Sequence, residues 1–407
     1  MRSSRRSDGF TMVELLVALT GALFLSIGVF MLAKHTSALY QRELRVAGAN
    51  LSAVVGFERL RSDIARAGFL SSPNVRRDPF VCGSPATDAE WPEQLSKLAS
   101  VTIGDIAISD LPDLFSANGL SPQRILLAGN YSSVEAFPIR AITETGGNFQ
   151  VYLQVLSGPM ARLGYLEEDA PQQALLQTVF PPGRAVRIVD RSGRHHYGTI
   201  LSVTGGDTPL LTLKGGSPDL IFRSGSAMGC GLKGQETGAL INTVNFIRYG
   251  IRDLRSDDRY APLYAESTMP AYEDERTELV REELDPSGNA FAGSADLVAE
   301  YAVDLRFRLT VAPSTTSALT CVQQNKVSDW AGDPVTLTTG KGPQLIRAVH
   351  AWLSVRSREA DRSATIATSS GPLFRVGLGP GATAPFARVR TVQARVALHN
   401  QMGVTWQ

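Results

Sequence analysis

The sequence predicts an α+β protein in which one long N-terminal helix is followed by a large, β-rich globular head. No proline occurs between Phe10 and Ser72, and this stretch opens with an almost wholly apolar run from Leu15 to Ala33. After Ser72 the chain changes to short apolar or alternating runs separated by Gly, Pro, Asn and Asp, a pattern that is typical of strands and turns.

The N-terminal end predicts a membrane anchor with an unusual carboxylate. Arginines precede the apolar run at positions 2, 5 and 6, and such charges hold a chain end in the cytoplasm, so the residues after the run are expected outside. Glu14 lies at the start of the apolar segment, where an unpaired carboxylate costs about 3 kcal/mol. We therefore expect Glu14 to be functional rather than structural.

The same helix is expected to continue past the membrane as an amphipathic segment. From Phe10 to about Ala67 it would measure roughly 85 Å. Gly68 is a suitable helix stop, and Pro73 prevents further extension. One apolar stripe is predicted to dock on the protein's own head, formed by Val46, Ala53, Phe57, Leu60, Ile64 and Ala67.

The chain is accordingly divided into a leader at 1–9, a helix at 10–68 with a transmembrane part at 10–33 and an amphipathic part at 34–68, and a head at 69–407. An insertion is expected at about 312–343, where alternation is weak. A hairpin turn is expected at Asp190–Gly193. Strands are predicted at 124–128, 149–155, 185–189, 197–203, 210–213, 243–251, 297–311, 346–356 and 389–398.

The net charge bears on nucleic-acid binding, and the cysteine content bears on disulfide formation. Lys and Arg total 40 against 39 for Asp and Glu, so the net charge of +1 gives no overall electrostatic case for nucleic-acid binding. Cys82, Cys230 and Cys321 all lie in the part expected outside the cytoplasm, where a disulfide can form. Three cysteines allow three alternative single bridges, and the spacing does not choose among them.

The sequence gives no catalytic, cofactor or metal motif. The run Gly377–Gly381 contains Pro380 and is expected to be an ordinary loop rather than a phosphate site. His195 and His196 are adjacent, so they should point to opposite faces of a strand and are expected as exposed hairpin residues. The acidic runs 273–275 and 285–289 lack EF-hand spacing and are expected to be solvated turns.

Three residues carry a resemblance to type IV prepilins and pseudopilins. In those proteins a peptidase cleaves after a Gly, the new first residue, usually Phe, is N-methylated, and Glu stands at the fifth mature position. Gly9, Phe10 and Glu14 match these positions. The resemblance implies cleavage between Gly9 and Phe10, methylation of Phe10, and a role for Glu14 in filament assembly by neutralising a neighbouring subunit's N-terminal amine.

Further segments resemble the PilW family of minor pilins. The end of the helix, Leu60–Phe69, matches a run in which Leu-Arg-x-Asp leads to Ala-Gly-aromatic. Ala265 and His399 stand where the family frequently has Arg. Looser matches lie at Phe246–Ile251, Leu263-Tyr264, Glu278–Val280, Ala302–Phe307, Ala351–Arg358 and Thr391–Asn400. The resemblance implies a strand at Leu263-Tyr264.

The resemblance implies a non-enzymatic minor pilin without cofactor. It would be a single-pass inner-membrane protein with a periplasmic head that later joins the pilus at the cell surface, in support of pilus assembly and twitching motility. Implied partners are the prepilin peptidase, the inner-membrane assembly platform, other minor pilins, the major pilin and a tip adhesin. The alternatives are a J-like minor pseudopilin of type II secretion, and an adhesive or DNA-binding tip module. Clustering of four arginines on one hairpin would favour DNA binding, namely Arg184, Arg187, Arg191 and Arg194.

Overall fold

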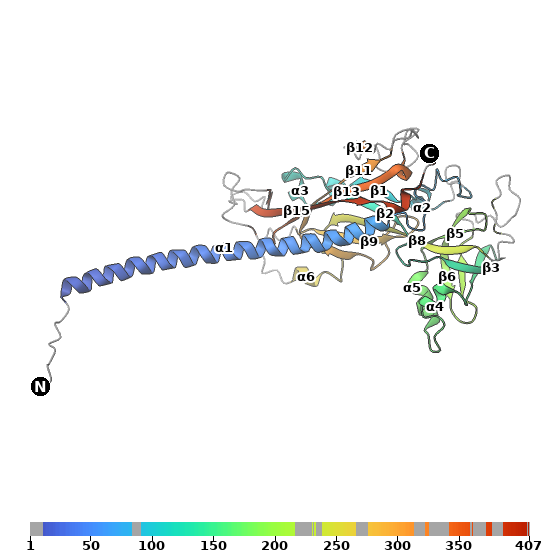
Figure 1. Cartoon of the computed structure of the whole chain (residues 1–407), viewed down its shortest axis with the longest axis horizontal. Coiled ribbons are helices and arrows are strands. Elements are labelled where there is room, and N and C mark those ends of the chain that lie inside the picture. The colour runs from blue at the N-terminus through green and yellow to red at the C-terminus, as the bar shows by residue number, and fades with distance from the viewer. Residues whose placement is uncertain are drawn as a thin grey trace.

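The protein, seen here as a computed structural model, consists of a long helical rod and a head built from antiparallel sheets (Figure 1). The structure describes the chain from residue 11 onward. Its description omits residues 84–90, 216–229, 231, 233–237, 266–275, 313–321, 325–341, 359, 361–371, 377–385, 405 and 407.

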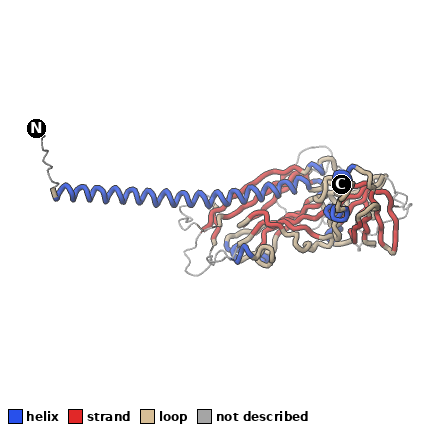
Figure 2. The backbone as a smooth tube through the Cα atoms, turned by 90° about the horizontal axis from the view of Figure 1, so that it is seen from below, coloured by secondary structure: helices blue, strands red, loops and turns tan. Residues whose placement is uncertain are grey.

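The rod is helix α1, Met12–Arg66, whose 55 residues correspond to about 82 Å. Its N-terminal half projects from the head, and its C-terminal half lies along it (Figures 1 and 2). Gly68 follows with a φ of +76° and donates its N–H to the carbonyl of Ala128 at 2.8 Å. This left-handed conformation favours glycine and redirects the chain into the head.

One face of the head is a five-stranded sheet in the order β12, β11, β13, β15, β14. Its antiparallel strands are β11 (Ala302–Val311), β12 (Val322–Gln324), β13 (Ile346–Arg356), β14 (Leu373–Arg375) and β15 (Phe386–Ala397). The expected single strand at 297–311 is wrong, because β10 (Asp296–Ala299) ends before β11 begins. Tyr301 lies in the break with a φ of +55°, which an extended strand does not allow.

The second sheet is formed by β1 (Val101–Asp105), β2 (Gln123–Gly129), β8 (Leu240–Arg252), β9 (Glu278–Leu284) and β10, together with the strands of the barrel described below. The buried stripe of α1 shares one hydrophobic core with the inner faces of both sheets. The predicted docking of this stripe is confirmed for its members Ala53, Phe57, Leu60, Ile64 and Ala67, all of which are buried.

A closed six-stranded antiparallel barrel is inserted between β2 and β8, which are neighbours in the second sheet. The pairings run in a ring from the first part of β8 through β3, β4, β7, β6 and β5 and back to β8. Closure removes unpaired strand edges from the ring. The strands are β3 (Phe137–Thr145), β4 (Asn148–Leu153), β5 (Ala185–Val189), β6 (His195–Thr204) and β7 (Leu210–Leu213).

The barrel has a hydrophobic core of its own, to which α4 (Gly158–Arg162) and α5 (Gln172–Val179) contribute Met160, Leu176 and Val179. It lies at the end of the head far from the N-terminus (Figure 1). The sequence predicted one head at 69–407 and did not indicate the barrel. The insertion expected at about 312–343 falls mostly outside the described residues.

Short elements complete the head. They are α2 (Glu93–Ser96), η1 (Ile108–Asp110), α3 (Asp113–Ala117), α6 (Pro262–Ala265), η3 (Pro343–Leu345) and η4 (His399–Gln401). The expected strand at Leu263-Tyr264 is wrong, because these residues lie in α6. The hydroxyl of Tyr264 accepts the N–H of Leu254 at 3.3 Å, which holds the α6 turn against the end of β8 rather than in a ladder.

Candidate functional site

The first candidate region is the projecting half of α1. Residues 12–37 form a helix long and apolar enough to cross a membrane by length and composition, with a mean hydropathy of 2.5, and no part of that window is buried against the head. The hydroxyls of Thr20 and Thr36 donate to carbonyls of the preceding turn at 3.0 and 2.8 Å. These bonds satisfy the two threonine hydroxyls within the helix. Residues 15–33 are almost wholly apolar around the helix, which suits an apolar environment.

Glu14 lies in the first turn of this helix and closes a capping box with Thr11. Its Oε2 accepts the N–H and the hydroxyl of Thr11 at 3.0 and 2.9 Å, and the Thr11 hydroxyl in turn accepts the N–H of Glu14 at 3.3 Å. The carboxylate is thus held at the positive end of the helix dipole. Gly9 and Phe10 lie outside the described residues.

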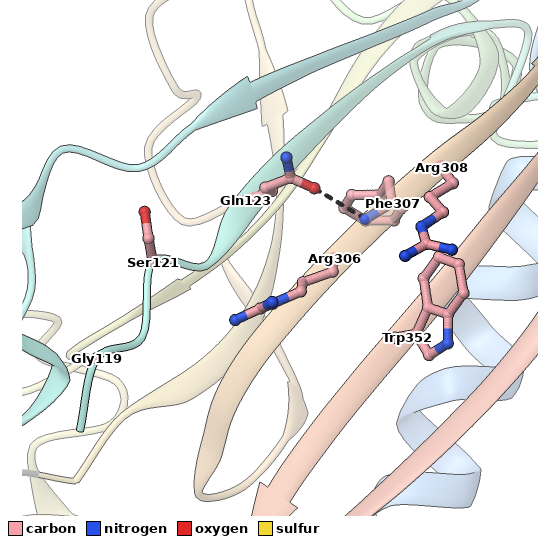
Figure 3. A pocket seen from close by; sticks show the side chains of 7 residues that line it. All are labelled: Gly119, Ser121, Gln123, Arg306, Phe307, Arg308 and Trp352. Carbon is pink, nitrogen blue, oxygen red and sulfur yellow. Dashed lines mark hydrogen bonds between the residues drawn. The ribbon is translucent and has the colours of Figure 1, made fainter. Parts of the chain in front are cut away.

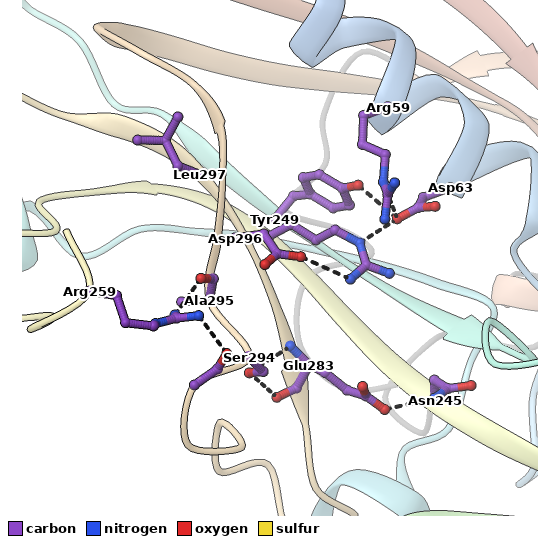
Figure 4. A network of polar contacts seen from close by, with 12 residues as sticks. Arg59, Asp63, Asn245, Tyr249, Arg259, Glu283, Ser294, Ala295, Asp296 and Leu297 are labelled. Atoms are coloured by element: carbon purple, nitrogen blue, oxygen red, sulfur yellow. Dashed lines mark hydrogen bonds and ion pairs between the residues drawn. The ribbon is translucent and has the colours of Figure 1, made fainter. Parts of the chain in front are cut away.

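The second candidate region is a buried polar clamp between α1 and the second sheet (Figure 4). Asp63 Oδ2 accepts the hydroxyl of Tyr249 on β8 at 2.7 Å and Nε of Arg281 on β9 at 2.7 Å. The backbone carbonyl of Asp63 accepts the Tyr131 hydroxyl at 2.8 Å. Arg59 and Asp296 stand at the margin, each about 4 Å from its ion-pair partner. The carboxylate of Asp63 therefore joins the helix to two strands, and its backbone carbonyl joins the helix to a loop.

The pKa shifts in this clamp are caused by burial and by the Asp63 carboxylate. Burial and the Asp63 carboxylate both raise the pKa of the Tyr249 hydroxyl, which therefore stays protonated and donates to Asp63. Burial opposes the charge on Arg281, but its hydrogen bond to Asp63 outweighs that effect and raises its pKa. Because both charges are partnered, the ion pair is satisfied inside the head.

A second buried cluster surrounds Tyr301, one of the two residues between β10 and β11. The guanidinium carbons of Arg276 and Arg356 lie 4.7 and 4.8 Å from its ring centroid. Glu278 pairs with Arg276 and accepts the N–H of Tyr301 at 2.9 Å. Burial raises the pKa of the Glu278 carboxyl to about 7, although Arg276 acts to lower it. The cluster fixes the unusual backbone of Tyr301 beside α1.

The barrel is fastened to the rest of the head by covalent and polar contacts. A disulfide joins Cys82 to Cys230, which selects one of the three bridges that the sequence allowed. Cys321 is the remaining cysteine and lies outside the described residues. Beside the bridge, the N–H of Cys82 donates to the carbonyl of His195 at 2.9 Å.

The expectation that His195 and His196 are exposed is wrong. His196 is 2% exposed, and its Nε2 lies 3.1 Å from the carboxylate of Asp190. His195 is covered by the segment ending at Cys82, and its Nδ1 lies 3.4 Å from the carboxylate of Asp78. Burial lowers the pKa of both histidines, although Asp78 and Asp190 act to raise it. The two rings do contact different partners, as their adjacency in a strand requires.

The four arginines around the β5–β6 hairpin do not form a cluster facing solvent together. Arg184 donates to the carboxylate of Glu283, and its side chain is largely buried. Arg187 contacts the His195 ring at 2.6 Å, and Arg194 donates to the carbonyl of Pro79 at 2.8 Å. Arg191 lies against Gly238. The contacts of Arg184 and Arg194 hold the barrel to the rest of the head, whereas Arg187 and Arg191 contact residues of the barrel itself. The condition that would favour DNA binding at this hairpin, a shared solvent-facing cluster of the four arginines, is therefore not met.

Among the remaining sequence candidates, the acidic run 285–289 lies in the described part of the chain and forms a turn. Asp285 accepts backbone N–H groups of Ser287 and Asn289, both at 2.9 Å, and so closes the turn between β9 and β10. The acidic run 273–275 and the loop 377–381 lie outside the described residues. In the described part of the chain, no three His, Cys, Asp or Glu side chains are grouped to hold a metal ion.

No protein-family model, curated protein or solved structure matches this chain.

The sequence indicated Asp63 only as part of a motif and did not indicate its partners Tyr249 and Arg281, which lie far along the chain. A signal was present, since β9 places Arg281 among three glutamates in a strand that is buried along most of its length. Such charges require partners inside the fold.

Proposed function

We propose that this protein is a non-enzymatic filament subunit, a minor pilin of PilW type. It would be inserted in the inner membrane as a single-pass protein, cleaved between Gly9 and Phe10, methylated at Phe10, and assembled with other minor pilins and the major pilin. The observation that carries the proposal is the projecting half of α1, which is apolar on all sides, free of the head, and has the Glu14 carboxylate in its first turn.

The physical argument concerns where this helix can be stable. An apolar helix with no covered face needs hydrocarbon or other helices around it. A bilayer supplies the first environment before assembly, and a bundle of like helices supplies the second. The C-terminal half of α1 is fastened to the head through Asp63, so movement of the helix from one environment to the other carries the head with it.

Glu14 is the residue proposed to act in filament assembly. Cleavage after Gly9 would create an amine one residue before Thr11, the residue that Glu14 contacts. Within the bundle, the carboxylate of one subunit would pair with the N-terminal amine of its neighbour, and such pairing relieves the burial of both charges. Thr11 holds the carboxylate at the helix end until that exchange.

The size of the head favours a sparse or terminal position. The barrel widens the head at the end far from the membrane anchor (Figure 1). Repetition of this bulk along a shaft would crowd neighbouring subunits, whereas one copy at the tip has space. We infer a role in priming assembly and in occupying the tip, with the prepilin peptidase and the assembly platform as partners, and a tip adhesin as a further one.

Substitution of Glu14 tests the proposal. In cells that carry Glu14→Gln as the only copy, we expect normal amounts of processed protein in the membrane. Its amount in sheared filaments should fall by about tenfold, the factor for one lost contact of about 1.4 kcal/mol.

The matched control is Glu58→Gln, which removes an exposed carboxylate of the same helix that pairs with Arg61 at 2.7 Å. This variant should enter filaments like the wild type. Equal incorporation of Glu14→Gln and wild type would overturn the assigned role of Glu14.

A further inference from the structure

The outer face of the five-stranded sheet carries a group of arginines around an indole. In the pairing of β11 with β13 and of β13 with β15, Arg308, His350 and Arg395 stand opposite one another. The next row of the same face consists of Arg306, Trp352 and Gln393. We call these six residues the arginine–tryptophan face.

Trp352 is held in a fixed orientation at the centre of this face. Its Nε1–H donates to Oε1 of Gln393. The Arg308 guanidinium carbon lies 5.3 Å from the Trp352 ring centroid. The His350 ring stacks beside the indole with centroids 6.1 Å apart and an interplanar angle of 20°. Indole, imidazole and guanidinium thus form a platform of flat groups.

A hollow of about 440 Å³ adjoins the platform. Arg306, Arg308 and Trp352 line it from the sheet, and Ser121 and the first residue of β2, Gln123, line it on the opposite side (Figure 3). Gln123 Oε1 accepts the N–H of Phe307 at 2.8 Å, which keeps this wall against β11. The volume is within the range of small-molecule sites.

The charge on the face is positive. Asp304 is paired with Arg306 at 2.7 Å, whereas neither Arg308 nor Arg395 makes an ion pair with any acid in the described part of the chain. Burial lowers the pKa of His350, and the nearby charges of Arg395 and Arg308 lower it further. An anionic ligand would therefore be attracted to the row that contains both arginines.

We propose that the arginine–tryptophan face binds single-stranded nucleic acid, with a base stacked on the Arg308–Trp352 platform and phosphates bound by Arg306, Arg308 and Arg395. Arg306 and Arg308 are two residues apart on one strand, about 7 Å, and Arg308 and Arg395 are two strands apart, about 10 Å. Three cations at such intervals suit consecutive phosphates of an extended chain.

The flat groups favour this ligand over other anions. A planar guanidinium or indole offers a stacking surface to any base, and single-stranded nucleic acid is bound without sequence preference by stacking combined with basic grooves. An acidic peptide would use the arginines but has no planar group for the platform. Arginine forks also match phosphate oxygens two at a time.

The test uses the full-length chain in nonionic detergent micelles and a fluorescent, short oligothymidylate, with fluorescence anisotropy as the readout. Wild type should bind. Arg308→Gln, Arg395→Gln and Trp352→Ala should each weaken binding by about tenfold. Each arginine substitution should also reduce the slope of log affinity against log salt by about 0.7.

Arg140→Gln is the matched control. Arg140 is an exposed arginine placed over an aromatic ring, Tyr152, at 5.9 Å, but it lies on the barrel. This variant should bind like the wild type. Trp352→Phe retains a stacking surface and should lose less affinity than Trp352→Ala, which separates loss of the site from loss of the fold.

An abasic oligomer of equal length has the phosphates without the bases, and we expect it to bind about tenfold more weakly. Equal binding of the abasic oligomer, or equally strong and variant-sensitive binding of heparin or polyglutamate, would show a general anion surface and overturn the proposal. Absence of oligothymidylate binding to the folded wild type, or an equal effect of Arg140→Gln, would also overturn it.

Discussion

Asp63 is the residue through which the rod and the head are most directly joined. Its carboxylate is buried and receives a hydroxyl from one strand and a guanidinium from the next. Removal of one partner from a buried ion pair leaves the other charge without compensation, which is a larger effect than the net value of the pair. The position is therefore far more sensitive to substitution than an exposed acid on the same helix.

Asp63→Asn should destabilise the head by about 3–5 kcal/mol, because Arg281 then remains charged and buried without its carboxylate. The effect is measured as loss of hydrogen-exchange protection at residues 53–67 and as a lower urea midpoint. Asp296→Asn, which removes the distant and largely exposed partner of Arg281 at 3.9 Å, should change stability by less than about 0.5 kcal/mol.

The double variant Asp63→Asn with Arg281→Met provides a second check, since it removes both charges. It should be more stable than Asp63→Asn alone. If Asp63→Asn and Asp296→Asn have equal, small effects, Asp63 does not fasten the helix.

The buried histidines predict how stability depends on pH. Burial keeps the folded pKa of His195 and His196 below the ordinary value, whereas in the unfolded chain they titrate near about 6.5. Below that pH the unfolded state binds more protons than the folded state, so stability falls on acidification. The urea midpoint should decrease between about pH 7.5 and about pH 5.5.

His196→Gln should reduce this decrease, because it removes one of the two groups that cause it. His399→Gln, at an exposed histidine of η4, should leave the decrease unchanged. A midpoint that is constant over this pH range in the wild type would contradict the explanation.

At the scale of elements, α1 changes environment along its length. Residues 12–37 are exposed on all sides, and from Ala53 onward a stripe is buried in the head. Gly56 lies where the helix passes close to β10. A Cβ at this position would stand 2.7 Å from both the carbonyl oxygen of Val298 and the Cβ of Ala299. Glycine is therefore required for this approach of helix and strand.

Gly56→Ala should lower the thermal midpoint of the protein, because the clash involves backbone and exceeds the gain in helix propensity. Gly48→Ala is the matched substitution, since a Cβ there meets no atom within 4 Å. That variant should be stabilised by up to about 1 kcal/mol. Equal effects of the two substitutions would contradict close packing at Gly56.

The spacing of apolar residues predicted those helices and strands whose sequence pattern lies within the element itself. The stripe of α1 follows from apolar spacing alone, and strands such as β5 and β7 have the predicted bounds. The sequence did not predict β9 as a strand, because its glutamates and Arg281 are of residue types that usually lie on the surface. In the structure, Glu282 and Arg281 form ion pairs within the fold. Burial of His195 and His196 depends on the segment ending at Cys82, which no local pattern indicates.

At the scale of the whole molecule, the barrel is the feature that sequence reasoning did not find. Its closure depends on the pairing of β3 with β8 at Phe137 and Pro138, more than a hundred residues from their partners Ile241 and Leu240. A proline near the start of β3 also weakens the strand signal. Local patterns specify strands, whereas ring closure is a property of distant pairings.

The molecule thus combines an apolar rod, a two-sheet head fastened to it, and a barrel at the far end. We propose that such a subunit moves from a bilayer into a helical bundle and presents its barrel outward. The sequence alone predicted the rod and the β-rich head. The candidate site was predicted only at Glu14, because the charges that fasten the head pair across the fold.

The most direct measurement is mass spectrometry of filaments sheared from cells, with a search for the peptide that begins at N-methylated Phe10. The account predicts this peptide at low stoichiometry beside an abundant major pilin. Processed protein found only in membranes would favour a priming complex or a pseudopilus. Retention of residues 1–9 in cells that assemble filaments, or presence of the protein as the main shaft subunit, would contradict the account.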